Sequence, residues 1–184
     1  MSDAIAYARR IAALHEELGI PHDYSLPRRL DIQPEAGELV SIGPDDAGRD
    51  CRLIELAAHA WRGMRARARE SEIQLLPLSG FRSVDRQVEI IRGKLALGET
   101  IDRILRTIAA PGYSEHHSGR AIDIGTPGAL PLEESFAETK AFAWLERHAA
   151  GFGFTLSFPK NNSRGFVYEP WHWCWRAECV HRAE

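Results

Sequence analysis

A chain of 184 residues that is 44% hydrophobic and contains five tryptophans can bury a core of its own, and it fits one domain. The net charge of -3 and the pI near 6.2 provide no overall basic surface, so nucleic acid is not expected as a partner. No apolar run reaches membrane-spanning length, so no membrane segment is expected.

The compartment stays open at this stage. The N-terminus lacks the continuous apolar stretch of a signal peptide, which favours the cytoplasm for the chain as it stands, or the cell envelope if a leader precedes it. The three cysteines form no CxxC pair, so neither a disulfide scaffold nor a zinc knuckle is indicated. A bridge between Cys174 and Cys179 remains open.

The first 49 residues precede the main run of predicted elements. Residues 4–18 carry apolar side chains at helical intervals, and Gly19-Ile20-Pro21 ends that pattern. Residues 21–49 are rich in proline, glycine and acidic residues, and only residues 38–42 resemble a strand. We therefore expect one domain over residues 1–184, in which residues 1–49 form a helix and a wrapping segment and residues 50–176 form the core.

The middle of the chain predicts two long helices around a strand. Apolar residues such as Leu53, Leu56, Trp61 and Met64 form an amphipathic stripe that predicts a helix over residues 50–70. Residues 73–78 predict a strand, which Pro77 places at an edge or a bulge. Further apolar stripes predict helices from residue 84 to residue 95 and from residue 101 to residue 108.

The second half adds three strands and a helix. Residues 121–124 alternate as a strand, and residues 152–158 and 165–175 are rich in aromatic and β-branched residues. Ser135 and Glu138 resemble a capping box at the start of a helix that Gly151 ends. The whole pattern predicts an α+β fold, a small and mainly antiparallel sheet flanked by helices.

Potential metal ligands occur in two stretches far apart in the chain. His116 and Asp123 lie in the first stretch, and His172 lies in the second. His117 is also a potential ligand. Neighbouring residues on an extended loop point in opposite directions, so His116 and His117 are not expected to bind the same ion together. Asp123 faces opposite to its apolar neighbours on the strand, toward a cleft.

Glu169 lies three residues before His172. On a regular strand this odd separation places the two side chains on opposite faces, and Pro170 provides a reason for a kink that brings them together. Arg82 follows a predicted strand and precedes a predicted helix, where a surface ion pair and a functional role are equally plausible from the sequence.

Three short motifs in this order resemble the LAS family of zinc peptidases, in particular its VanY-like D-alanyl-D-alanine carboxypeptidase branch. The motifs are Ser79-Gly80-Phe81-Arg82-Ser83 with Gln87, Ser114-x-His116-x-x-Gly119-x-Ala121-x-Asp123, and Glu169-Pro170-Trp171-His172. The resemblance implies one zinc ion held by His116, Asp123 and His172, in a cleft on the sheet. Its register selects His116 over His117.

The resemblance also implies roles for the remaining motif residues. Three protein ligands leave one position of zinc open for water, whose pKa falls to about 7. Glu169 is then the general base, and Arg82 binds the substrate and stabilises charge on the scissile carbonyl oxygen.

Three further residues are expected at the substrate. Ser114 either hydrogen-bonds the peptide or shapes its own loop. Gln87 either acts at the substrate, as its match to the motif implies, or is an amide on the surface of the predicted helix. Trp171 is expected in the core or as a wall of the cleft. The role of Glu115 is not resolved by the sequence.

The resulting hypothesis is a monomeric zinc metallopeptidase that removes the terminal D-alanine from a peptidoglycan stem peptide or muropeptide. An L,D-carboxypeptidase or a D,D-dipeptidase acting on cell-wall peptides is the enzymatic alternative, since the same groups serve all of them. An inactive, zinc-containing peptidoglycan-binding module is less favoured, because both Glu169 and Arg82 are present.

Overall fold

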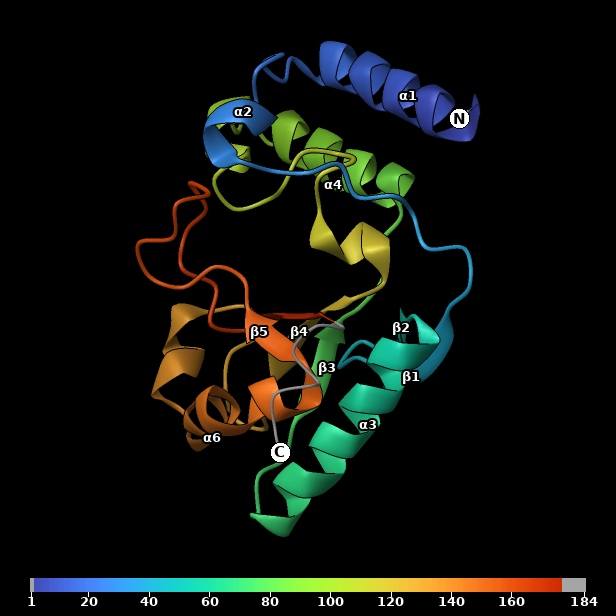
Figure 1. The fold of residues 1–184 in the computed structure, drawn as a ribbon. Coiled ribbons are helices and arrows are strands. Elements are labelled where there is room, and N and C mark those ends of the chain that lie inside the picture. The colour runs from blue at the N-terminus through green and yellow to red at the C-terminus, as the bar shows by residue number, and fades with distance from the viewer. Residues whose placement is uncertain (1, 177–184) are drawn as a thin grey trace.

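The computed structural model describes residues 2–176 and shows an α+β domain (Figure 1). The helices are α1 (Ser2–Leu18), α2 (Ser25–Arg28), α3 (Glu55–Glu70), α4 (Val84–Ala96), α5 (Ile101–Ile104) and α6 (Lys140–His148). The 3-10 helices are η1 (Glu115–Ser118), η2 (Glu134–Glu138) and η3 (Ala149–Phe152). The strands are β1 (Val40–Pro44), β2 (Asp50–Leu53), β3 (Leu76–Ser79), β4 (Ala121–Gly125), β5 (Phe154–Leu156) and β6 (His172–Trp175).

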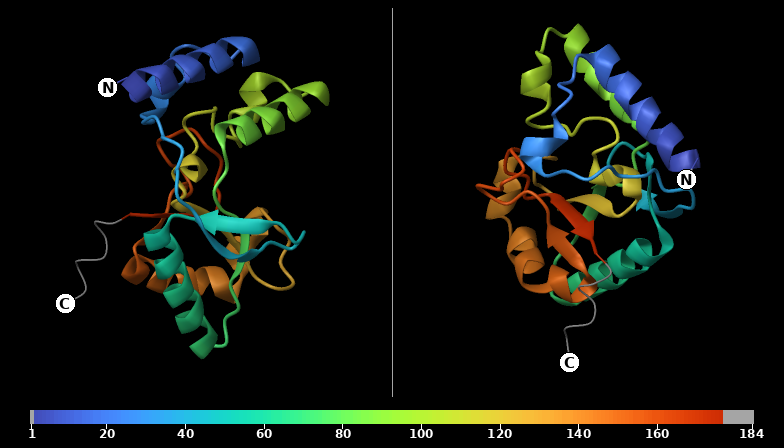
Figure 2. Two further views of the ribbon diagram at one scale, coloured as in Figure 1. Left: turned by 90° about the vertical axis from the view of Figure 1, so that its right-hand side faces the viewer. Right: turned by 45° about the horizontal axis from the view of Figure 1, so that its top comes forward.

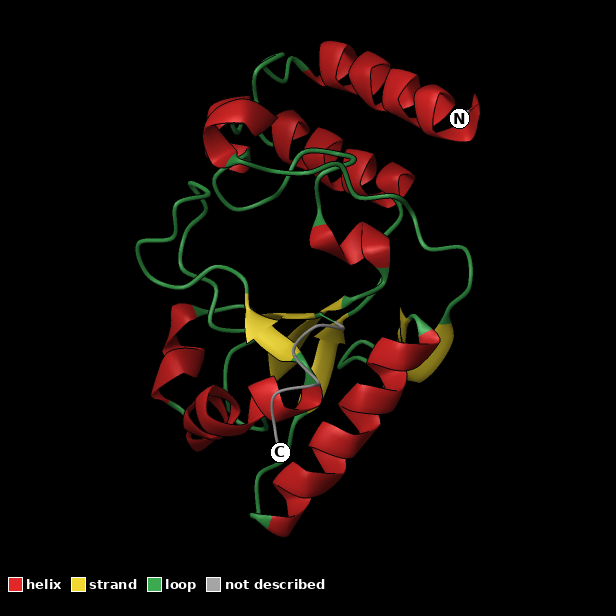
Figure 3. Ribbon diagram, viewed as in Figure 1, coloured by secondary structure: helices red, strands yellow, loops and turns green. Residues whose placement is uncertain are grey.

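The main sheet is antiparallel and has the strand order β3-β4-β6-β5. β1 and β2 form a separate antiparallel hairpin (Figure 3). β3 lies at the edge of the main sheet, and its register shifts between Pro77 and Ser79. Both the edge position and the bulge predicted from Pro77 are therefore confirmed, since proline cannot donate to a ladder.

Helices lie on both sides of the main sheet. α3 and α6 lie on one side, and α1 and α4 lie on the other, as the views in Figures 1 and 2 show. Ile122, Ile124 and Trp173 of the sheet belong to an apolar cluster with residues of α3 and α6. A second apolar cluster joins α1 and the residues on either side of α2 to α4, α5 and the segment after α5. Among residues 2–176, none of the helices is long and apolar enough to cross a membrane.

The helix predicted over residues 50–70 starts later than expected. Residues 50–53 form β2, in which Leu53 pairs with Val40, and α3 begins only at Glu55. Leu56, which was predicted to lie in the apolar stripe, is 64% exposed, whereas Trp61 and Met64 are fully buried. Pairing with β1, from which only residues 45–49 separate β2, overrides the helical periodicity of the first residues.

Two other predictions in the second half are wrong in detail. Ser135 does not cap a long helix, because it lies inside η2, and the hydroxyl of Thr139 accepts the capping hydrogen bond from the Phe142 amide at 3.1 Å. The strand predicted over residues 165–175 shortens to β6, since residues 165–171 are irregular. Cys174 is buried in β6, and its candidate partner Cys179 lies outside the described residues.

The α3 face that packs on the sheet can be tested by a pair of substitutions. Met64→Ala removes a fully buried side chain and should lower the free energy of unfolding by about 2–5 kcal/mol. Leu56→Ala, on the exposed face of the same helix, should change it by no more than about 0.5 kcal/mol. Urea unfolding followed by tryptophan fluorescence measures both, and equal losses would contradict the observed orientation of α3.

Candidate metal centre

Antiparallel pairing of β4 with β6 brings two of the predicted ligands together. Asp123 lies directly opposite His172, so their side chains project from the same face of the sheet. The neighbouring pair, Ile122 opposite Trp173, projects from the other face into the apolar cluster with α3 and α6. Asp123 is thus turned away from the core, as the alternation of residues 121–124 predicted.

His116 reaches the same place from η1, the short 3-10 helix before β4. The sequence had suggested an extended loop here, but residues 115–118 form η1, and Gly119 follows it with a φ of 65°. A Cβ atom at Gly119 would lie 2.9 Å from Leu39 and would require a conformation that L residues rarely adopt. Gly119 thus permits the turn from η1 into β4.

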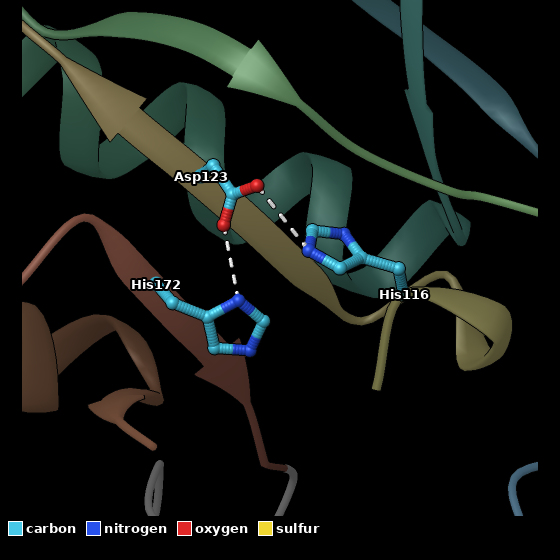
Figure 4. A group of neighbouring side chains, drawn as sticks. All are labelled: His116, Asp123 and His172. Atoms are coloured by element: carbon cyan, nitrogen blue, oxygen red, sulfur yellow. Dashed lines mark hydrogen bonds and ion pairs between the residues drawn. The ribbon is translucent and has the colours of Figure 1, made fainter. Parts of the chain in front are cut away.

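The three side chains converge around the Asp123 carboxylate (Figure 4). Its Oδ2 lies 3.3 Å from His116 Nε2, and its Oδ1 lies 3.0 Å from His172 Nδ1. One ligand atom from each of the three residues lies within 4.8 Å of the others, and all three residues are buried. This arrangement could hold a metal ion.

The outward-facing ring nitrogens of both histidines are engaged by the protein. His116 Nδ1 donates to the Gly80 carbonyl at 2.7 Å, and His172 Nε2 lies 3.0 Å from a carboxylate oxygen of Glu115. Each contact leaves the other ring nitrogen, His116 Nε2 and His172 Nδ1, directed at the centre. Outer partners of this kind orient metal-binding histidines and raise their basicity.

The donor set fits zinc. Two imidazole nitrogens and one carboxylate oxygen are typical zinc ligands, and three protein ligands are the number found in catalytic sites. Gly80 can pack closely against β2 only because it has no side chain, since a Cβ atom there would lie 2.5 Å from the Arg52 carbonyl oxygen. The backbone carbonyl that orients His116 is thus held by close packing against β2.

His117 points elsewhere and both of its ring nitrogens are used. Its Nδ1 donates to the Arg82 carbonyl at 2.6 Å, so its Nε2 is the acceptor for the Gly112 amide at 3.1 Å. Burial lowers the pKa of His117 to about 4, which keeps the ring neutral and able to accept that hydrogen bond. His117 therefore ties the metal-site loop to the segment that carries Arg82.

Glu115 is a site residue whose role the sequence left open. Its carboxylate is buried and contacts His172, Arg164 at 3.2 Å and Arg176 at 2.9 Å, and it accepts a short hydrogen bond from Ser157. Burial raises the pKa of Glu115, but the partners outweigh burial and hold it below its usual range. The sequence offered one signal for this contact with His172, namely the position of Glu115 between the motif residues Ser114 and His116.

Burial alone would lower the pKa of His172. Hydrogen bonds to Asp123 and Glu115 outweigh burial and raise its pKa to about 10. Two carboxylates that favour an imidazolium also favour a metal cation in the same place, because both responses come from the negative potential of these groups.

Glu169 and Arg82 line the same cleft as the three potential ligands, and the cleft has a volume of about 470 Å³. Glu169 reaches it through a turn rather than a kinked strand, since β6 starts only at His172 and the His172 amide donates to the Glu169 carbonyl at 3.1 Å. Burial raises the pKa of the Glu169 carboxyl to about 7. Arg82 lies between β3 and α4, as predicted.

Gln87 is fully buried, so the alternative of a helix-surface amide is wrong. Its Oε1 accepts from Arg82 Nη1 at 3.1 Å, and its Nε2 donates to the Ala109 carbonyl at 2.6 Å. A second hydrogen bond joins Arg82 Nη2 to Ser79 Oγ at 3.2 Å. Gln87 and Ser79 thus fix the direction of the arginine within the cleft.

Ser114 and Trp171 also line the cleft. Ser114 immediately precedes η1, and its hydroxyl does not cap that helix, although its carbonyl accepts from the His117 amide at 3.0 Å. Trp171 is partly buried, which agrees with the expected cleft wall, whereas Trp173 is buried in the core. All eight residues that the sequence suggested for the site line one cleft.

Comparison with known proteins places the chain in a family. The model of the VanY family, D-alanyl-D-alanine carboxypeptidase, matches residues 50–178. The chain belongs to this family. YodJ of Bacillus subtilis (strain 168), named as a carboxypeptidase, is 36% identical over 120 residues, which are 63% of this VanY-family chain and 43% of YodJ. The chain spans less than half the length of the first curated relatives it matches.

Solved structures show the same fold. The LD-carboxypeptidase LdcB has a TM-score of 0.69 and 30% identity over 77% of this chain and 69% of its own. The D,D-pentapeptidase VanY from the VanB-type vancomycin resistance cassette, solved in complex with Zn(II), has a TM-score of 0.61 and 25% identity. The second match covers 79% of this VanY-family chain and 83% of the other.

The two adjacent histidines provide a test of the metal centre. His116→Ala should abolish zinc binding, because it removes a donor atom, whereas His117→Ala should retain about one ion per chain. His117→Ala should instead lower the free energy of unfolding by roughly 1–3 kcal/mol, since its two buried backbone partners lose their hydrogen bonds. Metal analysis of protein purified without chelators measures the difference, and zinc loss in His117→Ala alone would contradict the assignment.

Proposed function

We propose that this protein is a zinc-dependent D-alanyl-D-alanine carboxypeptidase that hydrolyses the terminal D-alanine of peptidoglycan stem peptides. The observation that carries the proposal is the convergence of His116, Asp123 and His172 with Glu169 and Arg82 in one cleft, in a chain of the VanY family. In this proposal the first three residues hold one zinc ion. Zinc supplies Lewis acidity, which makes water a usable nucleophile at neutral pH.

Glu169 is the proposed general base. A carboxylate with a pKa near 7 is matched to proton transfer at neutral pH, and burial brings Glu169 into that range. It takes one proton from water as the new carbon–oxygen bond forms. When the carbon–nitrogen bond breaks, Glu169 returns the proton to the amine of the leaving D-alanine, so the group is regenerated in each cycle.

Arg82 is the proposed partner of the scissile carbonyl oxygen. Its guanidinium lines the cleft and is directed by hydrogen bonds to Gln87 and Ser79 before any substrate arrives. A preoriented cation costs no reorganisation when negative charge develops on that oxygen. Gln87 therefore acts on Arg82 in this proposal, while Ser114 and Trp171 line the cleft where the peptide would bind.

An L,D-carboxypeptidase activity is the second candidate, because LdcB, named as an LD-carboxypeptidase, matches with a TM-score of 0.69. The two activities share the chemistry of water activation and carbonyl polarisation. They differ in the configuration of the residue that precedes the terminal D-alanine, so the shape of the cleft decides between them.

Glu169→Ala tests the base. The variant should keep zinc, because Glu169 is not among the three proposed ligands, and its kcat should fall by about a hundred- to ten-thousandfold. Release of D-alanine from a pentapeptide, together with metal analysis, measures both effects. Glu146→Ala, which removes an exposed glutamate of α6, is the matched control and should leave kcat unchanged. Full activity in Glu169→Ala would exclude this mechanism.

A panel of defined muropeptides tests the substrate. Release of D-alanine from a pentapeptide that ends in D-Ala-D-Ala, but not from the corresponding tetrapeptide, is expected for the D,D activity. The opposite preference would establish the L,D alternative. If zinc is bound and mass spectrometry detects release from neither peptide, the carboxypeptidase proposal is wrong.

A further inference from the structure

One wall of the cleft is an irregular segment that needs support from elsewhere. Residues 157–171 join β5 to β6, and Phe158, Phe166 and Val167 of this β5–β6 loop line the cleft. The ring centroids of Phe158 and Phe166 lie 4.6 Å apart, and those of Phe158 and His172 lie 4.9 Å apart. Phe166 thus packs against Phe158, which fills the space between Phe166 and His172.

Arg28, at the end of α2, holds the outer side of this loop. Its Nη1 donates to the carbonyl oxygens of Arg164 and Gly165, both at 3.1 Å. Its guanidinium carbon lies 5.2 Å from the ring centroid of Phe166 and 4.9 Å from that of Tyr24. One side chain therefore fixes two backbone carbonyls and stacks against an aromatic ring of the cleft wall.

Tyr24, which immediately precedes α2, connects this region to a second wall of the cleft. Its hydroxyl accepts a hydrogen bond from the Ala110 amide at 3.1 Å, next to Ala109, which lines the cleft. Tyr24 is 5% exposed and belongs to the apolar cluster that contains α4 residues, so packing holds its side chain in place. The two walls also touch directly, since the Val167 amide donates to the Arg106 carbonyl at 3.1 Å.

We infer that Arg28 is a positioning residue for substrate binding, which holds the β5–β6 loop as a wall of the cleft through its contacts with Arg164, Gly165 and Phe166. The inference rests on the proposed carboxypeptidase function. It assigns part of the substrate site to α2, which lies outside the residues 50–178 that match the family model. Arg28 touches the wall and none of the proposed metal ligands, so its effect falls on peptide binding rather than on bond cleavage.

Steady-state kinetics with a pentapeptide ending in D-Ala-D-Ala test the inference. In Arg28→Ala the KM should rise roughly three- to tenfold while kcat changes by less than about twofold. This pattern is expected when a lost interaction stabilises the bound substrate and the transition state equally. Zinc content should be unchanged. Arg28→Lys keeps the charge but lacks the planar fork, so its KM should lie between those of Arg28→Ala and the unsubstituted protein. Arg9→Ala, which removes an exposed arginine of α1, should leave KM unchanged.

Hydrogen exchange provides a readout that needs no substrate. The Val167 amide should exchange about tenfold faster in Arg28→Ala, because the loop opens more often when its outer support is lost. If the unsubstituted protein is inactive on every peptide, the proposed function fails, and unchanged exchange at Val167 would overturn the positioning role by itself. If the protein is active and Arg28→Ala has the same KM, or lowers only the melting temperature, the inference is wrong.

Discussion

The pairing of β4 with β6 is the constraint on which the rest of the site depends. It sets Asp123 beside His172 on one face and Ile122 beside Trp173 on the other, so one register defines both the candidate metal centre and the apolar core. A slip by one residue would exchange the two faces. Burial of Ile122 and Trp173 therefore stabilises the same register that places Asp123 beside His172. Both residues of that pair are held in position by the sheet.

Much of the site was predictable from local sequence. The alternation around Asp123 predicted a strand with the carboxylate turned from the core, and the position of Arg82 between a strand and a helix was also correct. These features depend on near neighbours in the chain, since strand period and turn residues are local properties. The three separated motifs then predicted which residues the cleft would gather, because their spacing and order resembled those of a known family.

Features that depend on partners outside a residue's own helix or strand were not predictable. Residues 50–53 follow a helical pattern, yet they form β2 because β1 supplies a pairing partner. Gln87 lies in α4 but outside the apolar stripe of that helix. Its burial depends on hydrogen bonds with Ala109 and Arg82, which lie outside α4. Glu115 likewise gains its role from Arg164 and other groups contributed by segments far along the chain. Polar side chains are buried where such partners converge, and sequence periodicity contains no information on them.

The separation of the two ligand-bearing strands also governs when the centre can exist during synthesis. Asp123 and His172 are 49 positions apart, and α6 and β5 lie between them in the chain. A nascent polypeptide that has not yet reached residue 172 contains only two of the three proposed ligands, His116 and Asp123. On the proposed assignment, ribosome-bound fragments that end before residue 172 lack a complete metal centre, so the proposed activity would appear in a single late step of synthesis.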